Sequence, residues 1–170
     1  LMSAEAAIRS GAGLTTVATA PKNHSSIHAR LPEAMVLDWQ DEKQLHEILK
    51  TADVILIGPG LGLEQQSREL LTRVITSQKQ EQWLILDGSA ITLYAETSRL
   101  LNYAEQVIFT PHQMEWERLS GIKIDQQTKK RNEQAQRKLN SYVVLKSHRT
   151  EIYTHTDIYK NTVGTPAMAT

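Results

Sequence analysis

The stretch that decides the fold is Asp53-Val-Ile-Leu-Ile-Gly-Pro-Gly-Leu-Gly62. Its apolar run up to Ile57 is typical of a strand that is buried on both faces of a sheet. Glycines interrupt the run, and apolar residues spaced three and four apart, from Leu63 to Ile75, then predict a helix. A strand, a glycine-rich turn and a helix are the elements with which α/β proteins place backbone N–H groups against a phosphate. The spacing fits neither GxGxxG nor a P-loop, so a tight structural turn and a ligand-binding loop are both open interpretations.

Strands and helices alternate on both sides of this stretch. Further strands are predicted at 14–18, 34–37, 83–87, 107–109 and 141–146, and helices over 1–10, 42–50, 90–101 and 126–140. Gly11 ends the first helix, residues 20–33 read as a polar connection, and 151–153 with 157–160 read as an antiparallel hairpin. In the helix over 126–140, Ala135 and Leu139 are expected to face inward. This alternation predicts a three-layer α/β fold, a mainly parallel sheet sandwiched between helices, in which 54–57, 84–86, 107–109 and 143–145 are neighbouring parallel strands.

One more helix is predicted to begin at Thr110-Pro111-His112-Gln113. Thr110 would be its N-cap, Pro111 its first helical residue and Gln113 the second member of a capping box. The helix would end at Gly121.

Composition excludes several classes of protein. The 170 residues are 40% hydrophobic, which is enough for one globular domain with a core. Lys plus Arg and Asp plus Glu balance at 19 each without a basic run, so neither nucleic acid nor a membrane surface is an expected partner. The absence of cysteine excludes disulfides and thiolate metal sites. No apolar segment approaches the roughly eighteen residues of a membrane span, and no signal peptide is visible, so a cytoplasmic protein is expected.

The candidate chemistry follows the predicted strands. Ligands in α/β sheets bind beyond the carboxyl ends of the strands. In this chain those ends carry the segments 58–62, 87–89, 110–112 and 146–150. If the strands are parallel, all four segments lie at one edge of the sheet.

Six segments occur in the order found in a known family: Gly11-Ala-Gly-Leu-Thr-Thr-Val-Ala18, Ile57-Gly-Pro-Gly-Leu-Gly62, Leu86-Asp-Gly-Ser-Ala90, Phe109-Thr-Pro-His112, Val143-Val-Leu-Lys146 and Asn161-Thr-Val-Gly-Thr-Pro-Ala-Met-Ala-Thr170. Over essentially the whole chain they resemble the ADP/ATP-dependent NAD(P)H-hydrate dehydratases, ribokinase-like proteins long filed as carbohydrate kinases. The resemblance implies a three-layer ribokinase-like sandwich, a homo-oligomer, and an enzyme that uses ADP or ATP with Mg²⁺. Such an enzyme phosphorylates the C6 hydroxyl of (6S)-NAD(P)H hydrate, and loss of phosphate restores NAD(P)H.

The same resemblance implies roles for particular residues. Gly60 and Gly62 match the turn that contacts the hydrated cofactor, and His112 matches a substrate-contacting histidine, although a histidine at a helix start is otherwise usually a solvated residue. Lys146, Ser147, His148, Arg149 and Thr150 match a Lys-Gly-x-x-Thr segment that contacts the nucleotide, with Ser147 in place of the glycine. Asp87 stands where the family has an aspartate. It could orient Mg²⁺-bound water or simply cap the next helix.

The family pattern extends beyond both ends of the chain. After a segment like Met168-Ala169-Thr170 the family continues with Gly-Gly-Thr-Gly-Asp, whose amides form an anion hole and whose aspartate is the catalytic base. The family also has a strand before the opening helix. We therefore expect residues 1–170 to be one ribokinase-like domain truncated at both ends, without the catalytic base and inactive alone.

Two other function classes stay open. A small-molecule kinase of the same fold, acting on a vitamin, a thiazole or a sugar, would release a phosphorylated product. A non-enzymatic nucleotide-binding fragment is the second alternative. The context of His112 and the Gly-Pro-Gly-Leu-Gly turn favour the dehydratase.

Overall fold

The computed structural model describes residues 1–97 and 101–163. Contacts divide the chain into two compact units, Leu1–Thr51 and a second unit that begins at Ala52. The prediction that residues 1–170 form a single domain stays a prediction. The end of the helix predicted over 90–101 and the segment 164–170 of the family-like motif lie outside the described residues.

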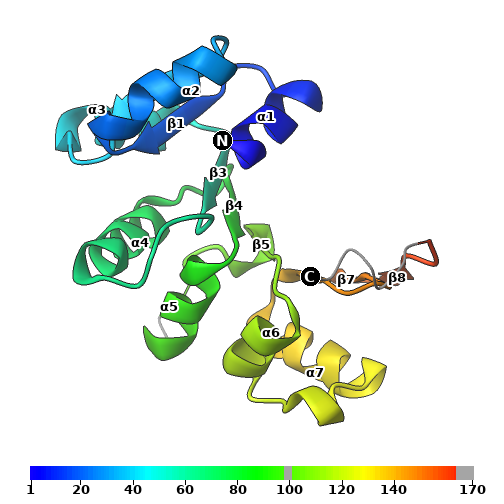
Figure 1. Ribbon diagram of the computed structural model, residues 1–170. Coiled ribbons are helices and arrows are strands. Elements are labelled where there is room, and N and C mark those ends of the chain that lie inside the picture. Colours follow the sequence, from blue (N-terminus) through cyan, green and yellow to red (C-terminus); the bar gives the residue numbers. More distant parts are fainter. Residues whose placement is uncertain (98–100, 164–170) are drawn as a thin grey trace. The chain divides into compact units, whose positions relative to one another are not determined.

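The first unit contains a pair of parallel strands, β1 and β2, with three α-helices (Figure 1). Its elements are α1 (Met2–Arg9), β1 (Thr16–Thr19), η1 (Pro21–Asn23), α2 (His24–Arg30), β2 (Met35–Asp38) and α3 (Glu42–Thr51). Gly11 follows the end of α1, as predicted. The polar connection predicted over 20–33 is wrong, because it contains η1 and α2. One apolar residue of α2, Ile27, packs with Leu31 and Ala34 in a small core, and such packing stabilises a helix whose sequence shows little periodicity.

The second unit is built on a six-stranded sheet whose order follows the chain. Its strands are β3 (Val54–Ile57), β4 (Trp83–Leu86), β5 (Val107–Phe109), β6 (Tyr142–Leu145), β7 (Glu151–Tyr153) and β8 (Ile158–Lys160). The first four are parallel to one another, and β7 and β8 continue the sheet as an antiparallel hairpin. Both the parallel neighbours and the hairpin were predicted from the sequence and are confirmed.

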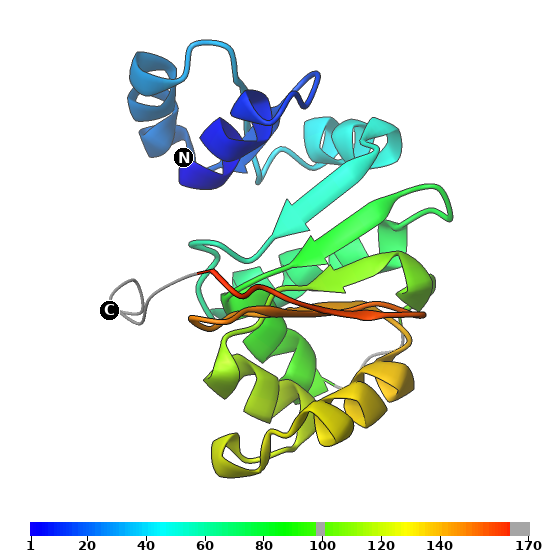
Figure 2. The ribbon, with the colours of Figure 1, turned by 90° about the vertical axis from the view of Figure 1, so that its right-hand side faces the viewer.

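The α-helices of the second unit lie on one face of this sheet (Figure 2). They are α4 (Gln65–Ser77), α5 (Ser89–Thr97), α6 (Gln113–Ser120) and α7 (Lys129–Leu139), with the short η2 (Ala104–Gln106) and η3 (Ile124–Gln126). Because crossovers between parallel strands are right-handed, strands paired in chain order place their helices on the same face. The residues of the strands that face the helices are fully buried: Leu84, Leu86, Val107, Phe109 and Val143.

The opposite face of β3 is exposed. Val54 is 54% and Leu56 is 43% solvent-accessible, so the prediction that this strand is buried on both faces is wrong for the described structure. The reason is the one-sided placement of α4 to α7, which a run of apolar residues does not reveal. None of the helices among the described residues is long and apolar enough to cross a membrane.

The inner face of α7 is polar. Ala135 and Leu139, predicted to face inward, are only partly buried, whereas Asn132 and Gln136 are each 2% exposed. Both amides are hydrogen-bonded: Trp116 Nε1 donates to Asn132 Oδ1 over 2.9 Å, and Gln136 Nε2 donates to the carbonyl of Ser141 over 2.7 Å. Buried amides are tolerated where they find such partners, so a rule based on apolar spacing selects the wrong face.

Candidate functional site

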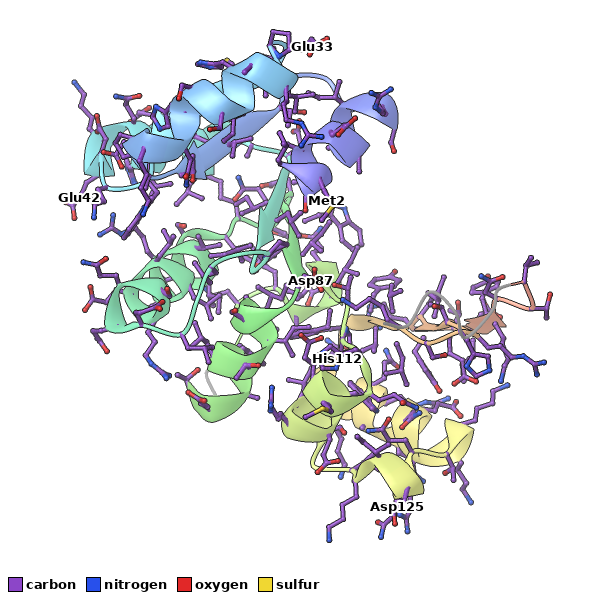
Figure 3. The ribbon with its side chains drawn as sticks, in the orientation of Figure 1. Met2, Glu33, Glu42, Asp87, His112 and Asp125 are labelled. Carbon is purple, nitrogen blue, oxygen red and sulfur yellow. The ribbon has the colours of Figure 1, made fainter. Side chains whose placement is uncertain are left out.

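Backbone hydrogen bonds continue past the strand ends and bring the candidate segments together. The N–H of Asp87 donates to the carbonyl of Ile57 over 3.1 Å, and the N–H of Thr110 donates to that of Leu86 over 3.0 Å. The backbone N–H of Lys146 donates to the carbonyl of Pro111 over 2.7 Å. The edge of the sheet predicted to collect these segments therefore exists, and Figure 3 shows Asp87 and His112 near the same end of the sheet.

At this edge Asp87 joins the ends of β4, β5 and β6. Its Oδ1 lies 2.6 Å from Lys146 Nζ and accepts a hydrogen bond from Thr110 Oγ1 over 2.7 Å. Burial raises the pKa of Asp87, but hydrogen bonds from Lys146 and Thr110 and the charge of Lys146 outweigh it, so the pKa lies below its usual value. Asp87 is thus an anion whose partner is the ammonium of Lys146.

The two roles considered for Asp87, orienting Mg²⁺-bound water and capping the next helix, stay predictions. The side chain contacts Thr110 and Lys146 on other strands, and its hydrogen bond to Thr110 was not predicted from the sequence. No group of three metal-binding side chains occurs within residues 1–97 and 101–163. A carboxylate already paired with an ammonium, and without a second acid, does not make a Mg²⁺ site by itself.

The glycine-rich turn after β3 has one structural glycine and one open glycine. The N–H of Leu61 donates to the carbonyl of Gly58 over 3.0 Å, which closes a four-residue turn with Pro59 and Gly60 at its centre. At Gly58, where φ is +129°, a Cβ would lie 1.6 Å from the carbonyl oxygen of Asp87, so only glycine fits. At Gly60, where φ is +73°, a Cβ would have no atom within 4 Å. The turn needs glycine at this position because of the positive φ angle. The space beside the Gly60 backbone is open to a ligand.

The helix after this turn begins later than predicted. α4 starts at Gln65, with Glu64 as its N-cap residue, and Gly62 lies two residues earlier. The carboxylate of Glu64 accepts a hydrogen bond from Ser67 Oγ over 3.3 Å. A negative charge at a helix N-terminus occupies the place that an anion would take. At Gly62, where φ is +82°, a Cβ would lie 2.1 Å from the same carboxylate, so Glu64 lies against this glycine while Gly60 is open. The predicted ligand contact of Gly60 and Gly62 stays a prediction.

The start of α6 differs from the prediction in a way that matters for His112. The N-cap residue is His112 and not Thr110. The capping box is closed by Glu115 and not by Gln113. Nδ1 of His112 accepts hydrogen bonds from the N–H groups of Met114 and Glu115 over 3.1 and 3.3 Å, and Glu115 Oε2 accepts from the N–H of His112 over 2.8 Å. Thr110 is unavailable as a cap because its hydroxyl bonds Asp87. The spacing His-x-x-Glu was the signal in the sequence, but histidine is not a usual N-cap residue. Gly121 ends the helix in a left-handed conformation, as predicted.

The segment after β6 forms a tight turn into β7. Lys146 is partly buried, and Ser147, His148 and Arg149 are exposed. Thr150 Oγ1 donates to the carbonyl of Ser147 over 3.0 Å, and Ser147 Oγ accepts from the N–H of Arg149 over the same distance. Asn140 is the single non-glycine residue with positive φ in the described parts of the chain, so Ser147 needs no glycine-like backbone at this position.

Comparison with known proteins decides the family. The family model described as NAD(P)H-hydrate dehydratase matches residues 1–170. The chain belongs to this family. It is 53% identical over its whole length to an ADP-dependent (S)-NAD(P)H-hydrate dehydratase of Enterococcus faecalis, and 51% identical to one of Lactiplantibacillus plantarum. The chain spans 58% and 61% of the lengths of these two relatives.

Solved structures of the dehydratase family and its superfamily confirm the fold class. A ribokinase-like superfamily protein of Enterococcus faecalis matches with a TM-score of 0.97 and 53% identity, over 99% of this chain and 60% of that one. An ADP/ATP-dependent NAD(P)H-hydrate dehydratase of Bacillus subtilis, co-crystallised with ATP/Mg²⁺ and soaked with CoA, matches with a TM-score of 0.77 and 26% identity, over 99% of this chain and 62% of that one. The ribokinase-like α/β fold expected from the sequence is therefore confirmed.

Proposed function

We propose that the protein containing this chain converts (6S)-NAD(P)H hydrate back to NAD(P)H in an ADP- or ATP-dependent reaction. The observation that carries the proposal is the edge of the sheet at which the family-like segments meet, in a chain matched from end to end by the dehydratase family. ADP is the first nucleotide to test, because the relatives from Enterococcus faecalis and Lactiplantibacillus plantarum are named as ADP-dependent. ATP is the second, because the Bacillus subtilis structure was obtained with ATP/Mg²⁺.

The residues at the edge divide into two groups. On the β3 and β5 side, the open backbone at Gly60, the backbone of Gly62 beside the carboxylate of Glu64, and the half-exposed ring of His112 would contact the hydrated cofactor. On the β6 side, Lys146 and the turn formed by Ser147, His148, Arg149 and Thr150 would contact the nucleotide. An ammonium group is a common point-charge partner of phosphate, and Asp87 holds that of Lys146 in place.

The chemistry asks mainly for positioning and charge. Phosphorylation of the C6 hydroxyl makes a phosphate leaving group, whose loss restores the reduced nicotinamide, and positioning and electrostatics dominate such transfers. Mg²⁺ would enter with the nucleotide phosphates, because this ion keeps several waters and takes few protein ligands. A cytoplasmic homo-oligomer is part of the same proposal, and light scattering on the full-length protein measures its subunit number.

A product assay separates this proposal from the alternatives. The full-length protein is incubated with hydrated NADH, Mg²⁺ and either nucleotide, while reduced-nicotinamide absorbance and inorganic phosphate are followed. A dehydratase restores the absorbance and releases phosphate, whereas a vitamin or sugar kinase leaves a phosphorylated small molecule and a binding fragment does neither. Absence of NADH recovery with both nucleotides would refute the proposal.

Two lysines provide a matched pair of variants for this assay. Lys146 pairs with Asp87 over 2.6 Å, and Lys160 pairs with Glu151 over 2.9 Å on the terminal hairpin. Lys146→Gln should raise the KM for the nucleotide about tenfold or more, because it removes a charge that faces phosphate. Lys160→Gln removes the same charge from a residue outside the proposed set of nucleotide contacts and should leave that KM unchanged.

A further inference from the structure

Glu115 is a buried acid for which the proposed reaction has no use. Its side chain is 8% exposed, whereas that of His112 is 51% exposed. A buried carboxylate is costly unless its oxygens are hydrogen-bonded. Both oxygens of Glu115 are directed to His112: Oε2 accepts from the backbone N–H over 2.8 Å, and Oε1 lies 3.3 Å from the ring nitrogen Nε2.

The second of these contacts goes beyond an ordinary helix cap. In a capping box the glutamate reaches back to the backbone N–H of the N-cap residue, which uses one oxygen. Serine and threonine, the usual residues at that position, have no second nitrogen for the other oxygen to meet. Here the N-cap side chain is an imidazole, so the same carboxylate also contacts the ring.

The hydrogen bonds determine which ring nitrogen carries the proton. Nδ1 of His112 accepts from two backbone N–H groups, those of Met114 and Glu115, and a nitrogen that accepts hydrogen bonds carries no proton. In neutral imidazole the proton is then on Nε2, beside the carboxylate of Glu115. The 3.3 Å contact of Nε2 with Oε1 is an ion-pair distance and not one of the hydrogen bonds of His112. The single Nε2–H is therefore the donor that the ring can offer to a ligand, while the carboxylate lies beside it.

We propose that Glu115 is a positioning residue that fixes His112 as a hydrogen-bond donor through Nε2. The ligand atom recognised by His112 is then an acceptor, such as a carbonyl, hydroxyl or phosphate oxygen of the substrate. This inference rests on the proposed function for the identity of the substrate, but the tautomer of His112 is a property of the protein alone.

The decisive measurement needs no activity. Imidazole ¹⁵N–¹H correlation spectra of the ligand-free full-length protein report which nitrogen of His112 is protonated, with His112→Asn used to assign the signals. We expect protonated Nε2 and unprotonated Nδ1 in the wild type. In Glu115→Gln the amide oxygen can still accept from the backbone N–H of His112, but the amide NH₂ can donate to Nε2 and compete with the donors at Nδ1, so we expect a mixture of tautomers. Glu117→Gln removes the same charge two residues along α6 and should give the wild-type spectrum. A proton on Nδ1 in the wild type would overturn the proposal, even if Glu115→Gln does not fold.

Kinetics then tests the consequence for the substrate. Glu115→Gln should raise the KM for hydrated NADH about tenfold, the loss expected when a ligand hydrogen bond is no longer oriented, while the KM for the nucleotide stays unchanged. On the His112→Asn background the same change should add nothing, because Glu115 acts through His112. An equal rise in both KM values, or an undiminished effect on that background, indicates a merely structural role and contradicts the proposal. If the wild type shows no dehydratase activity, the proposed function fails, and the spectra still decide the role of Glu115.

Discussion

Replacing Gly58 by alanine tests whether the close approach of β3 and β4 holds the site together. A Cβ at Gly58 would lie 1.6 Å from the carbonyl oxygen and 2.6 Å from the carbonyl carbon of Asp87. Unstrained contacts need roughly 3.5 Å, so the two backbones would have to separate by about 2 Å. The atoms in the way are backbone atoms, which cannot rotate aside.

The expected loss of stability at Gly58 has two sources. Overpacking costs about 1–3 kcal/mol, and a backbone angle that only glycine adopts readily costs about 1–3 kcal/mol more. Gly58→Ala should therefore lower the free energy of unfolding by about 2–6 kcal/mol. Gly60→Ala is the matched control, because it also has positive φ but no atom within 4 Å of the added Cβ, and it should cost only about 1–2 kcal/mol.

Urea unfolding of the full-length protein measures this difference. The midpoint for Gly58→Ala should fall well below that for Gly60→Ala at a similar slope. The change should also displace Asp87, which pairs with Lys146. If Lys146 moves with it, the KM for the nucleotide should rise. Equal midpoints for the two variants would show that the approach of the two backbones is not tight in solution, and the argument from Gly58 would fail.

Three other variants test separate parts of the structure. Gly60→Val should raise the KM for hydrated cofactor while leaving the KM for the nucleotide unchanged, because its side chain projects into open space where the ligand would approach; unchanged kinetics would remove Gly60 from the site. The pKa of Asp87 is lowered in the folded protein, so its contribution to stability is present above the usual aspartate pKa and is lost as the pH falls through the folded value. Chemical denaturation across acidic pH should thus show the stability advantage of the wild type over Asp87→Asn shrinking as the pH falls, and a constant difference would contradict this. Asn132→Ala leaves Trp116 Nε1–H buried without its acceptor and should cost about 2–4 kcal/mol, whereas the exposed Gln134→Ala on the same helix should stay within about 0.5 kcal/mol of the wild type; equal losses would remove Asn132 from the core.

The sheet could be predicted from the sequence because its signals are local. Short apolar runs separated by helical patterns fix the strands, and right-handed crossovers fix their parallel pairing. The helix α2 was missed because it carries a single buried apolar residue, Ile27. The inner face of α7 was misassigned because its buried residues are amides. The partners of Asn132, Trp116 and Tyr153, lie on other elements, and the partner of Gln136 is the carbonyl of Ser141 just after the helix.

The candidate site could be predicted as a set of segments but not as a set of contacts. Asp87, His112 and Lys146 were all named from the sequence, and the parallel strands place them at one edge. Their partners depend on side-chain geometry: Thr110 bonds Asp87 and does not cap α6, which leaves that cap to His112 and Glu115. One hydroxyl can serve either purpose, and sequence spacing alone does not choose between them.

The ion pair between Asp87 and Lys146 also has an evolutionary consequence. It joins residues 59 positions apart in the chain, each just past the end of its strand, and these strands, β4 and β6, are separated in the sheet by β5. Loss of either charge leaves the other partly buried without its partner, so natural variation at the two positions should be correlated among relatives. Chimeras whose crossover falls between β4 and β6 would inherit the two residues from different parents. Chimeras that contain both the aspartate and the lysine should still bind the nucleotide, and chimeras that lack one of the two should not.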